Sequence, residues 1–155
     1  MLIGSGMIGI IETIKEVCFG IDAQERKEIH GHVLDRLKRL FVKNGYRVHL
    51  EYPICFDSIV RKSGDMISKN GYLDLVAVKE KWKIAIEFDT GVHLKFKSIE
   101  KLFQVDADIC IGIIRGRSNT LGANIERIEQ VRGEFGFLKK DFWLIILSDR
   151  ISHKV

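Results

Sequence analysis

Three carboxylates interrupt two apolar segments of this chain, GYLDLVAV at 71–78 and KIAIEFDTG at 83–91. Asp74 lies in the first segment, and Glu87 and Asp89 lie in the second. A carboxylate in an apolar strand costs free energy unless another group stabilises its charge. The three residues are therefore the first candidates for a site with chemistry.

The apolar pattern around these acids predicts a β-hairpin with one defined register. A turn centred on Glu80 and Lys81 places Asp74 directly opposite Glu87, where Cβ atoms lie about 5 Å apart. The other face of the hairpin then becomes uniformly apolar, with three opposed pairs: Leu73 and Phe88, Leu75 and Ile86, and Ala77 and Ile84.

Two carboxylates this close repel one another, so both stay ionised only if a cation neutralises them. Oxygen ligands suit hard divalent ions, and we expect Mg2+ or Mn2+ here. Solvated acids at the ends of strands are the alternative.

The order of these residues resembles the PD-(D/E)xK nuclease superfamily, whose usual pattern places an aspartate on one strand and Glu-x-Lys on the next. The resemblance covers about residues 22–115. It implies a restriction-endonuclease-like α/β fold and a metal-dependent hydrolase. Asp74 and Glu87 would be catalytic residues and metal ligands.

Asp89 stands where this superfamily has its lysine. Three outcomes follow. In the first, a lysine from the next helix replaces it; the candidates are Lys95, Lys97 and Lys101, of which Lys97 and Lys101 are nearest in helical phase. In the second, Asp89 becomes a further metal ligand and the metal alone activates water. In the third, the site is inactive and the fold is kept for binding.

The superfamily also places a glutamate on the preceding helix, and Glu25 and Glu28 are the candidates. Asp22-x-x-Glu25 has the spacing of a capping box, which gives Glu25 a structural role. We therefore choose Glu28 as a metal ligand and catalytic acid, with His32 one turn later as its support. An exposed Glu28 on a charged helix face is the alternative.

The formal charge of +4 fits a polyanionic partner. We expect five basic residues to contact nucleic acid: Arg61, Lys62, Lys95, Arg115 and Arg117. Double-stranded DNA is the expected substrate, because most members of the superfamily with this pattern act on it. A polar residue of the helix after the acidic strand, Gln104, is a weaker site candidate.

The length of 155 residues indicates one nuclease-like domain. Its parts are an amphipathic N-terminal helix over 1–20, a motif-bearing core over 22–115, and a C-terminal helix and strand over 116–155. Between the first helix and the end of the chain we expect a helix over 22–45, a strand over 46–54, an irregular segment over 55–71, the hairpin, a helix over 97–105, a strand over 108–116, a helix over 123–135 and a last strand over 141–149. The expected fold is a mixed sheet flanked by helices, with an extra helix at the N-terminus.

Three widely spaced cysteines, Cys18, Cys55 and Cys110, are typical of buried reduced thiols, so we expect a cytoplasmic protein without a membrane span. The apolar first helix packs on the domain or on a second subunit, and a homodimer would supply two sites for two strands. The leading hypothesis is a Mg2+-dependent endodeoxyribonuclease. The alternatives are an inactive nucleic-acid-binding or assembly module, and a metal-binding structural domain.

Overall fold

The computed structural model describes residues 2–21, 28–117, 119–136 and 140–155, with side chains of the first helix described from residue 9 onward. The elements are, in chain order, α1 Leu2–Phe19, α2 Ile29–Lys43, β1 Arg47–Ile59, β2 Met66–Lys79, β3 Trp82–Asp89, α3 Phe96–Gln104, β4 Ile109–Ile114, α4 Leu121–Phe135, β5 Asp141–Ile146 and β6 Ile151–Lys154.

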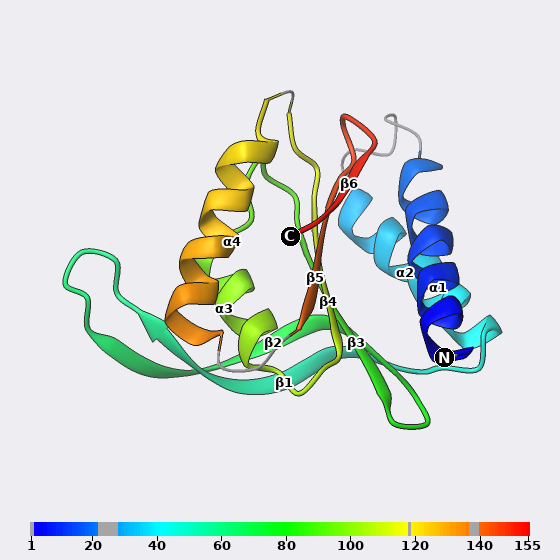
Figure 1. Cartoon of the computed structure of the whole chain (residues 1–155), viewed down its shortest axis with the longest axis horizontal. Helices are drawn as coiled ribbons and strands as arrows, with labels where there is room; N and C mark the ends of the chain where they lie inside the picture. Colours follow the sequence, from blue (N-terminus) through cyan, green and yellow to red (C-terminus); the bar gives the residue numbers. More distant parts are fainter. Residues whose placement is uncertain (1, 22–27, 118, 137–139) are drawn as a thin grey trace.

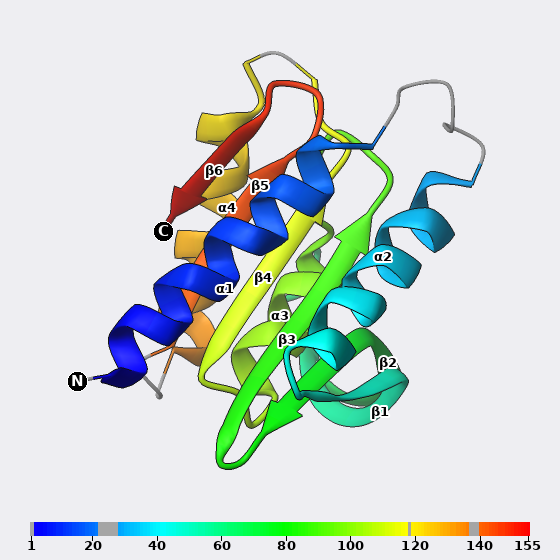
Figure 2. The ribbon, with the colours of Figure 1, turned by 90° about the vertical axis from the view of Figure 1, so that its right-hand side faces the viewer.

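The six strands form one mixed sheet in the order β1-β2-β3-β4-β5-β6. β3, β4 and β5 run parallel, and the other neighbouring strands pair antiparallel. Helices α1 and α2 cover one face of the sheet and α3 and α4 cover the other (Figures 1 and 2). The expected α/β class and mixed sheet with helices on both faces are confirmed.

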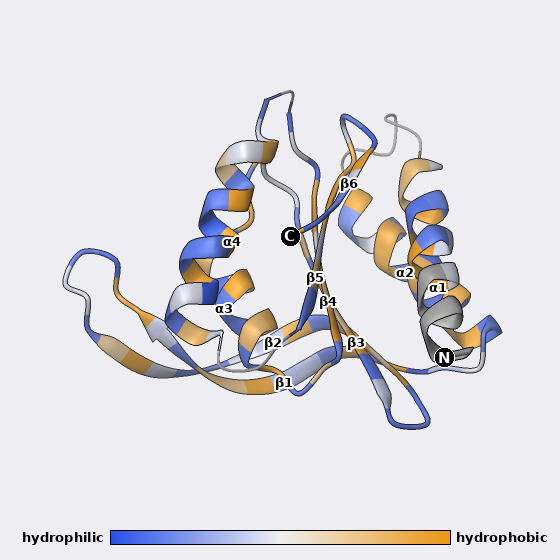
Figure 3. Cartoon of the chain, in the orientation of Figure 1, coloured by the Kyte–Doolittle hydropathy of each residue, from blue (hydrophilic) through white to orange (hydrophobic). Residues whose placement is uncertain are grey.

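Each face of the sheet has its own apolar core (Figure 3). On the first face, α1 contributes Ile10, Ile11, Ile14 and Cys18, all buried. The apolar stripe of α1 therefore packs on its own domain, which is the first of the two expected alternatives. None of the helices among the described residues is long and apolar enough to span a membrane.

The expected hairpin register is confirmed where the ladder continues, because Leu75 pairs with Ile86 and Ala77 pairs with Ile84. Leu73 departs from the expected pattern. It packs in the core beneath α3 and α4, whereas Leu75 packs beneath α1 and α2. The apolar face therefore does not continue unbroken past Leu75, which is where Asp74 lies.

The prediction that residues 55–71 form an irregular segment is wrong. β1 continues to Ile59 and β2 begins at Met66, so the two strands form a long hairpin that projects beyond α4 (Figure 1). Polar residues occur here because tertiary contacts support them. The Ser68 hydroxyl donates to Asp57 across the ladder at 3.0 Å.

Side chains of α3 hold this hairpin from outside the sheet. Gln104 accepts a hydrogen bond from the backbone N–H of Asp57 and donates one to its carbonyl, both at 2.7 Å. Buried Glu100 accepts from the Ser58 hydroxyl at 2.8 Å and from the Ile59 N–H at 2.9 Å. These bonds satisfy the open backbone groups of an edge strand, so Gln104 has a structural role.

Two further boundaries differ from the sequence predictions. A short strand, β6, follows the expected last strand and pairs antiparallel with it. Helix α3 begins at Phe96, one residue before the expected start, and Ser98 lies in its first turn. The expected start of the second helix at Asp22, and the capping role of Glu25, fall outside the described residues.

Candidate functional site

The expected acids meet where the parallel strands have their carboxyl ends, which we call the edge of the sheet. A pocket of about 400 Å³ opens there. β2 and β3 supply the acids, α3 supplies cations and α2 supplies one histidine to its walls, which include Asp74, Glu87, Asp89, Lys95, Lys97, Lys101 and His30. The carboxyl ends of parallel strands are the usual position of ligand sites in open α/β sheets.

Asp74 and Glu87 replace part of the ladder between β2 and β3. The backbone N–H of Asp74 donates to Oε2 of Glu87 at 3.2 Å, and the N–H of Phe88 donates to Oδ2 of Asp74 at 2.7 Å. Each carboxylate thus binds the backbone of the opposite strand. The two adjacent antiparallel strands therefore bring both side chains into the same pocket, as the register predicted.

Lys101 of α3 reaches this pair of acids. Its ammonium forms an ion pair with Oε1 of Glu87 and also donates to the carbonyl of Tyr72 at 2.7 Å. Gly71 lies next to the aliphatic part of Lys101: a Cβ atom added at Gly71 would be 3.8 Å from Cδ of the lysine. Lys97 also lines the pocket, so the structure brings both candidate lysines to the site and gives only Lys101 a contact with Glu87 among the interactions described.

Burial dominates the electrostatics of Glu87, which is 3% exposed. The pKa of Glu87 is raised to about 8, first by burial and then by a hydrogen bond with the Asp74 carboxyl and the charge of Asp74, while Lys101 lowers it. One lysine near two acids leaves a negative charge that burial disfavours. A pKa of about 8 favours the protonated form of Glu87 at neutral pH, and a bound cation would favour the ionised form instead.

Asp89 is bonded to the start of α3. Its Oδ2 accepts from the backbone N–H of Lys95 at 2.9 Å, and its Oδ1 accepts from the Ser98 hydroxyl at 3.2 Å. Both oxygens are thus engaged within the protein. This geometry favours the first of the three sequence outcomes, in which a helix lysine replaces the missing strand lysine.

Glu28 does not join the site. It is the N-cap residue of α2, its side chain is 80% exposed, and it pairs with His32 at 3.3 Å, as the spacing predicted. His30 is the α2 residue that lines the pocket. The sequence choice of Glu28 is therefore corrected, because the helix turns Glu28 to solvent and His30 inward.

His30 was missed by sequence reasoning. Its Nε2 lies 3.3 Å from Oδ1 of Asp74, and its ring centroid lies 5.4 Å from that of Phe88. The usable signal was helical phase, since His30 precedes Leu34 and Leu37 by four and seven residues on the inward side of α2.

Of the five basic residues expected to contact nucleic acid, the side chains of four have no structural role in the described contacts, and that of the fifth, Arg61, has one. Lys95 lines the pocket, and exposed Arg117 and half-buried Arg115 follow β4 at the same edge of the sheet, where the Arg115 N–H donates to the carbonyl of Asp89 at 3.3 Å. Exposed Lys62 lies in the turn of the long hairpin. These residues remain available to phosphates.

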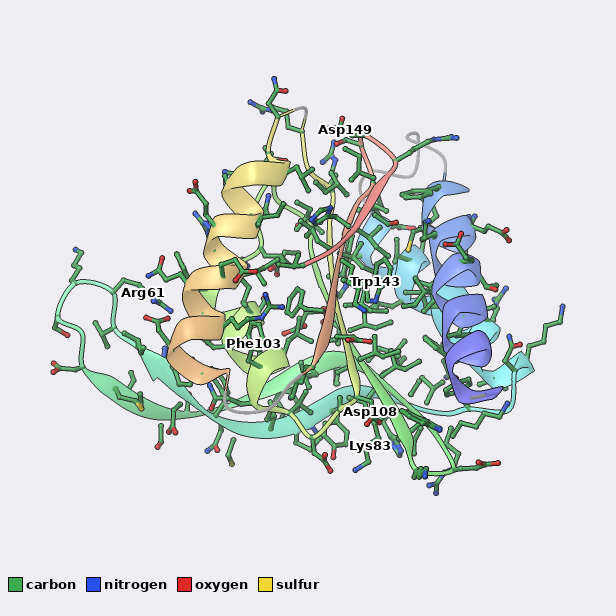
Figure 4. The ribbon with its side chains drawn as sticks, in the orientation of Figure 1. Arg61, Lys83, Phe103, Asp108, Trp143 and Asp149 are labelled. Atoms are coloured by element: carbon green, nitrogen blue, oxygen red, sulfur yellow. The ribbon has the colours of Figure 1, made fainter. Side chains whose placement is uncertain are left out.

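Arg61 has a structural position instead. Its guanidinium pairs with Glu134 at 2.9 Å and with Glu100 at 3.3 Å, and it lies 4.2 Å from the ring centroid of Phe96. Figure 4 shows it between the hairpin and α4. Because its charge is neutralised there, we remove Arg61 from the expected phosphate contacts.

The donor set fits Mg2+ in one specific way. Among the residues that the structure describes, no group of three or more His, Cys, Asp or Glu side chains is arranged to hold a metal ion. Mg2+, however, is commonly bound by one or two carboxylates together with waters and substrate phosphates. Asp74 and Glu87 suit that mode, because both carboxylates line the same pocket.

Comparison of the chain with family models, with curated proteins and with solved structures finds no match. The functional assignment therefore depends on the residues and their geometry.

Proposed function

We propose that this chain is a divalent-metal-dependent nuclease that hydrolyses phosphodiester bonds, with double-stranded DNA as its substrate. One observation carries the proposal: Asp74 and Glu87, on adjacent strands, meet Lys101 from α3 in one pocket at the sheet edge. Two acids can hold a metal ion for phosphodiester hydrolysis, and a cation beside them can stabilise the charge that develops on the phosphate.

Each of the three residues has a distinct role in this proposal. Asp74 and Glu87 would hold Mg2+ or Mn2+, with the remaining positions left to waters and a substrate phosphate. The bound ion would polarise the phosphate and lower the pKa of a water. Lys101 keeps a positive charge beside Glu87 and stabilises negative charge that develops on the phosphate.

Basic side chains around the pocket support a polyanionic substrate. Lys95 and Lys97 at the start of α3, and Arg115 and Arg117 after β4, share the sheet edge with the acids. Their contacts to phosphates would position the duplex without reading its sequence. A homodimer, which cleavage of both strands would use, and a cytoplasmic location stay predictions.

The proposal includes the restriction-endonuclease-like fold. It is supported by the order β1-β2-β3-α3-β4 around the acids and by the antiparallel β2–β3 pair followed by a parallel β4. The sequence motif and the strand order are different features of the chain, and both favour this fold.

A second candidate, an inactive nucleic-acid-binding or assembly module, is favoured by a different observation. Asp89 replaces the motif lysine, and its carboxylate is engaged by α3. A protein of this kind would bind duplex DNA through the same basic edge and leave it intact.

Conversion of supercoiled plasmid to nicked and linear forms tests both candidates. We expect cleavage with Mg2+ or Mn2+, none with EDTA, and none by Asp74→Ala. Lys154→Met is the matched control for the lysine variants below, because this lysine pairs with Asp141 and does not line the pocket. Binding without cleavage by the wild-type protein under every metal condition would refute the nuclease and favour the binding module.

Comparison of Lys101→Met with Lys97→Met assigns the catalytic lysine. Lys101→Met should lower the single-turnover rate at saturating DNA about 100-fold with little change in affinity. Lys97→Met should mainly weaken binding, since a phosphate contact contributes to affinity rather than to the chemical step. Wild-type rates for Lys101→Met at saturation would exclude it from catalysis.

A further inference from the structure

Helix α3 begins without a capping group of its own. The N-cap residue, Lys95, makes no side-chain cap hydrogen bond, and the first turn contains no acid. It carries cationic Lys95 and Lys97 instead, and positive charge is unfavourable at a helix N-terminus. Asp89 supplies what the helix lacks, because its carboxylate accepts from the Lys95 N–H and from the Ser98 hydroxyl.

The contacts of Asp89 and Glu87 with α3 form a matched pair. The two acids lie two residues apart, on the same side of β3. Ser98 and Lys101 lie three residues apart, on the same side of α3. Ser98 binds Asp89 and Lys101 binds Glu87, so α3 runs back along β3 with two polar contacts that fix its position.

Apolar packing alone does not fix this position. Ile99, Leu102 and Phe103 bury the opposite side of α3 in the core, but hydrophobic contacts are non-directional. Hydrogen bonds to a carboxylate are directional and strong. Glu100 and Gln104 also hold α3, but their hydrogen bonds go to β1. The cap at Asp89 fixes the first turn of α3 beside β3, the strand that carries Glu87, and so helps to decide whether Lys101 points at Glu87.

We propose that Asp89 is a positioning residue that places Lys101 against Glu87. The inference rests on the proposed function, and it gives the substituted motif position a role: the acid at 89 anchors the helix that delivers the cation. It differs from the hypothesis that Asp89 is a metal ligand, because a ligand acts whether or not Lys101 is present.

A double-mutant cycle in single-turnover cleavage separates these roles. Asp89→Ala should lower the rate about 10-fold when Lys101 is present and less than about twofold in the Lys101→Met background, since residues that act as a unit are not additive. Equal losses in both backgrounds would overturn the proposal. Asp89→Asn, which keeps one carbonyl acceptor, should recover part of the rate.

Metal binding provides a second readout. Mn2+ titrated calorimetrically into the DNA-free protein should bind Asp89→Asn within about twofold of wild type, whereas loss of a direct ligand would weaken binding about 10-fold or more. A 10-fold weaker affinity would overturn the positioning role.

Urea unfolding tests the same idea without any activity. The midpoint shifts of Asp89→Asn and Lys101→Met should be non-additive, while those of Asp89→Asn and Lys97→Met should add. Non-additivity in a protein that cuts no DNA would keep the positioning role and reject the proposed function. Additivity for both lysines would overturn the positioning role even in an active nuclease.

Discussion

The protein is expected to lose stability as the pH rises from acidic to weakly alkaline values, and Glu87 is the cause. Its pKa is about 8 in the folded protein and has an ordinary value of 4.5. Between these values the folded state holds a proton that the unfolded chain has released. Stability from this group is therefore complete below the lower pKa and is lost as the pH passes the higher one.

The size of the effect follows from the two pKa values. Between about pH 5.5 and about pH 8.5, linkage gives a loss of about 3 kcal/mol from Glu87 alone. Glu87 is buried, so solvent screening does not reduce this figure as it would for a surface acid. The loss would be a large fraction of the stability of an ordinary domain.

Urea denaturation of wild type and Glu87→Gln across this pH range measures the effect. Glutamine preserves the size of the side chain and removes its titration, so the free energy of unfolding of wild type relative to Glu87→Gln should fall by about 3 kcal/mol as the pH rises. Glu129→Gln on the surface of α4 controls for the loss of one acidic charge. All samples contain EDTA, since a cation would replace the proton.

Parallel pH profiles for wild type and Glu87→Gln would refute this reasoning. They would mean that Lys101 neutralises Glu87 fully and that the pKa of Glu87 is not raised. A fall in stability as the pH drops would be equally contrary, because it is the sign expected for a carboxylate with a depressed pKa.

Three further predictions concern the metal and the DNA. At about pH 8, millimolar Mg2+ or Mn2+ should raise the melting temperature by about 5 °C relative to EDTA, because the ion binds only the folded carboxylates; equal melting temperatures would count against a metal site. His30→Ala should weaken Mn2+ binding about 10-fold by releasing Asp74, whereas His32→Ala, whose residue pairs with Glu28, should not. Replacing Arg115 and Arg117 by alanine should reduce the slope of log affinity against log salt by about 2; an unchanged slope would remove this loop from the binding surface.

The central pair of acids could be predicted from sequence because a short-range rule determines it. Alternating apolar residues on both sides of a tight turn allow few registers, and a slip of one residue would expose Leu75 and Ile86. The sequence also predicted that Lys97 or Lys101 would reach the acids. The sequence could not choose between them, since the choice depends on where α3 starts and how it is rotated.

The remaining misjudgements share a physical cause, which is tertiary support for polar residues. Asp57 and Ser58 read as loop residues, yet Gln104 and Glu100, more than forty positions later, bind that strand. Asp89 read as a possible ligand because its partners, Lys95 and Ser98, become its neighbours only when α3 folds back along β3. Local sequence patterns cannot predict such contacts between separate elements.

The charge balance around the pocket explains how the chain accommodates a third acid, Asp89. Asp74, Glu87 and Lys101 together carry one net negative charge when both acids are ionised, and burial makes that charge costly. An additional free carboxylate would increase the cost, but the charge of Asp89 is bonded to the N-terminus of α3, where negative charge is favourable. The carboxylate of Asp89 is thus stabilised by the helix that brings in Lys101. The buried group of Asp74, Glu87 and Lys101 is left with one negative charge when both acids are ionised, which a divalent cation would offset.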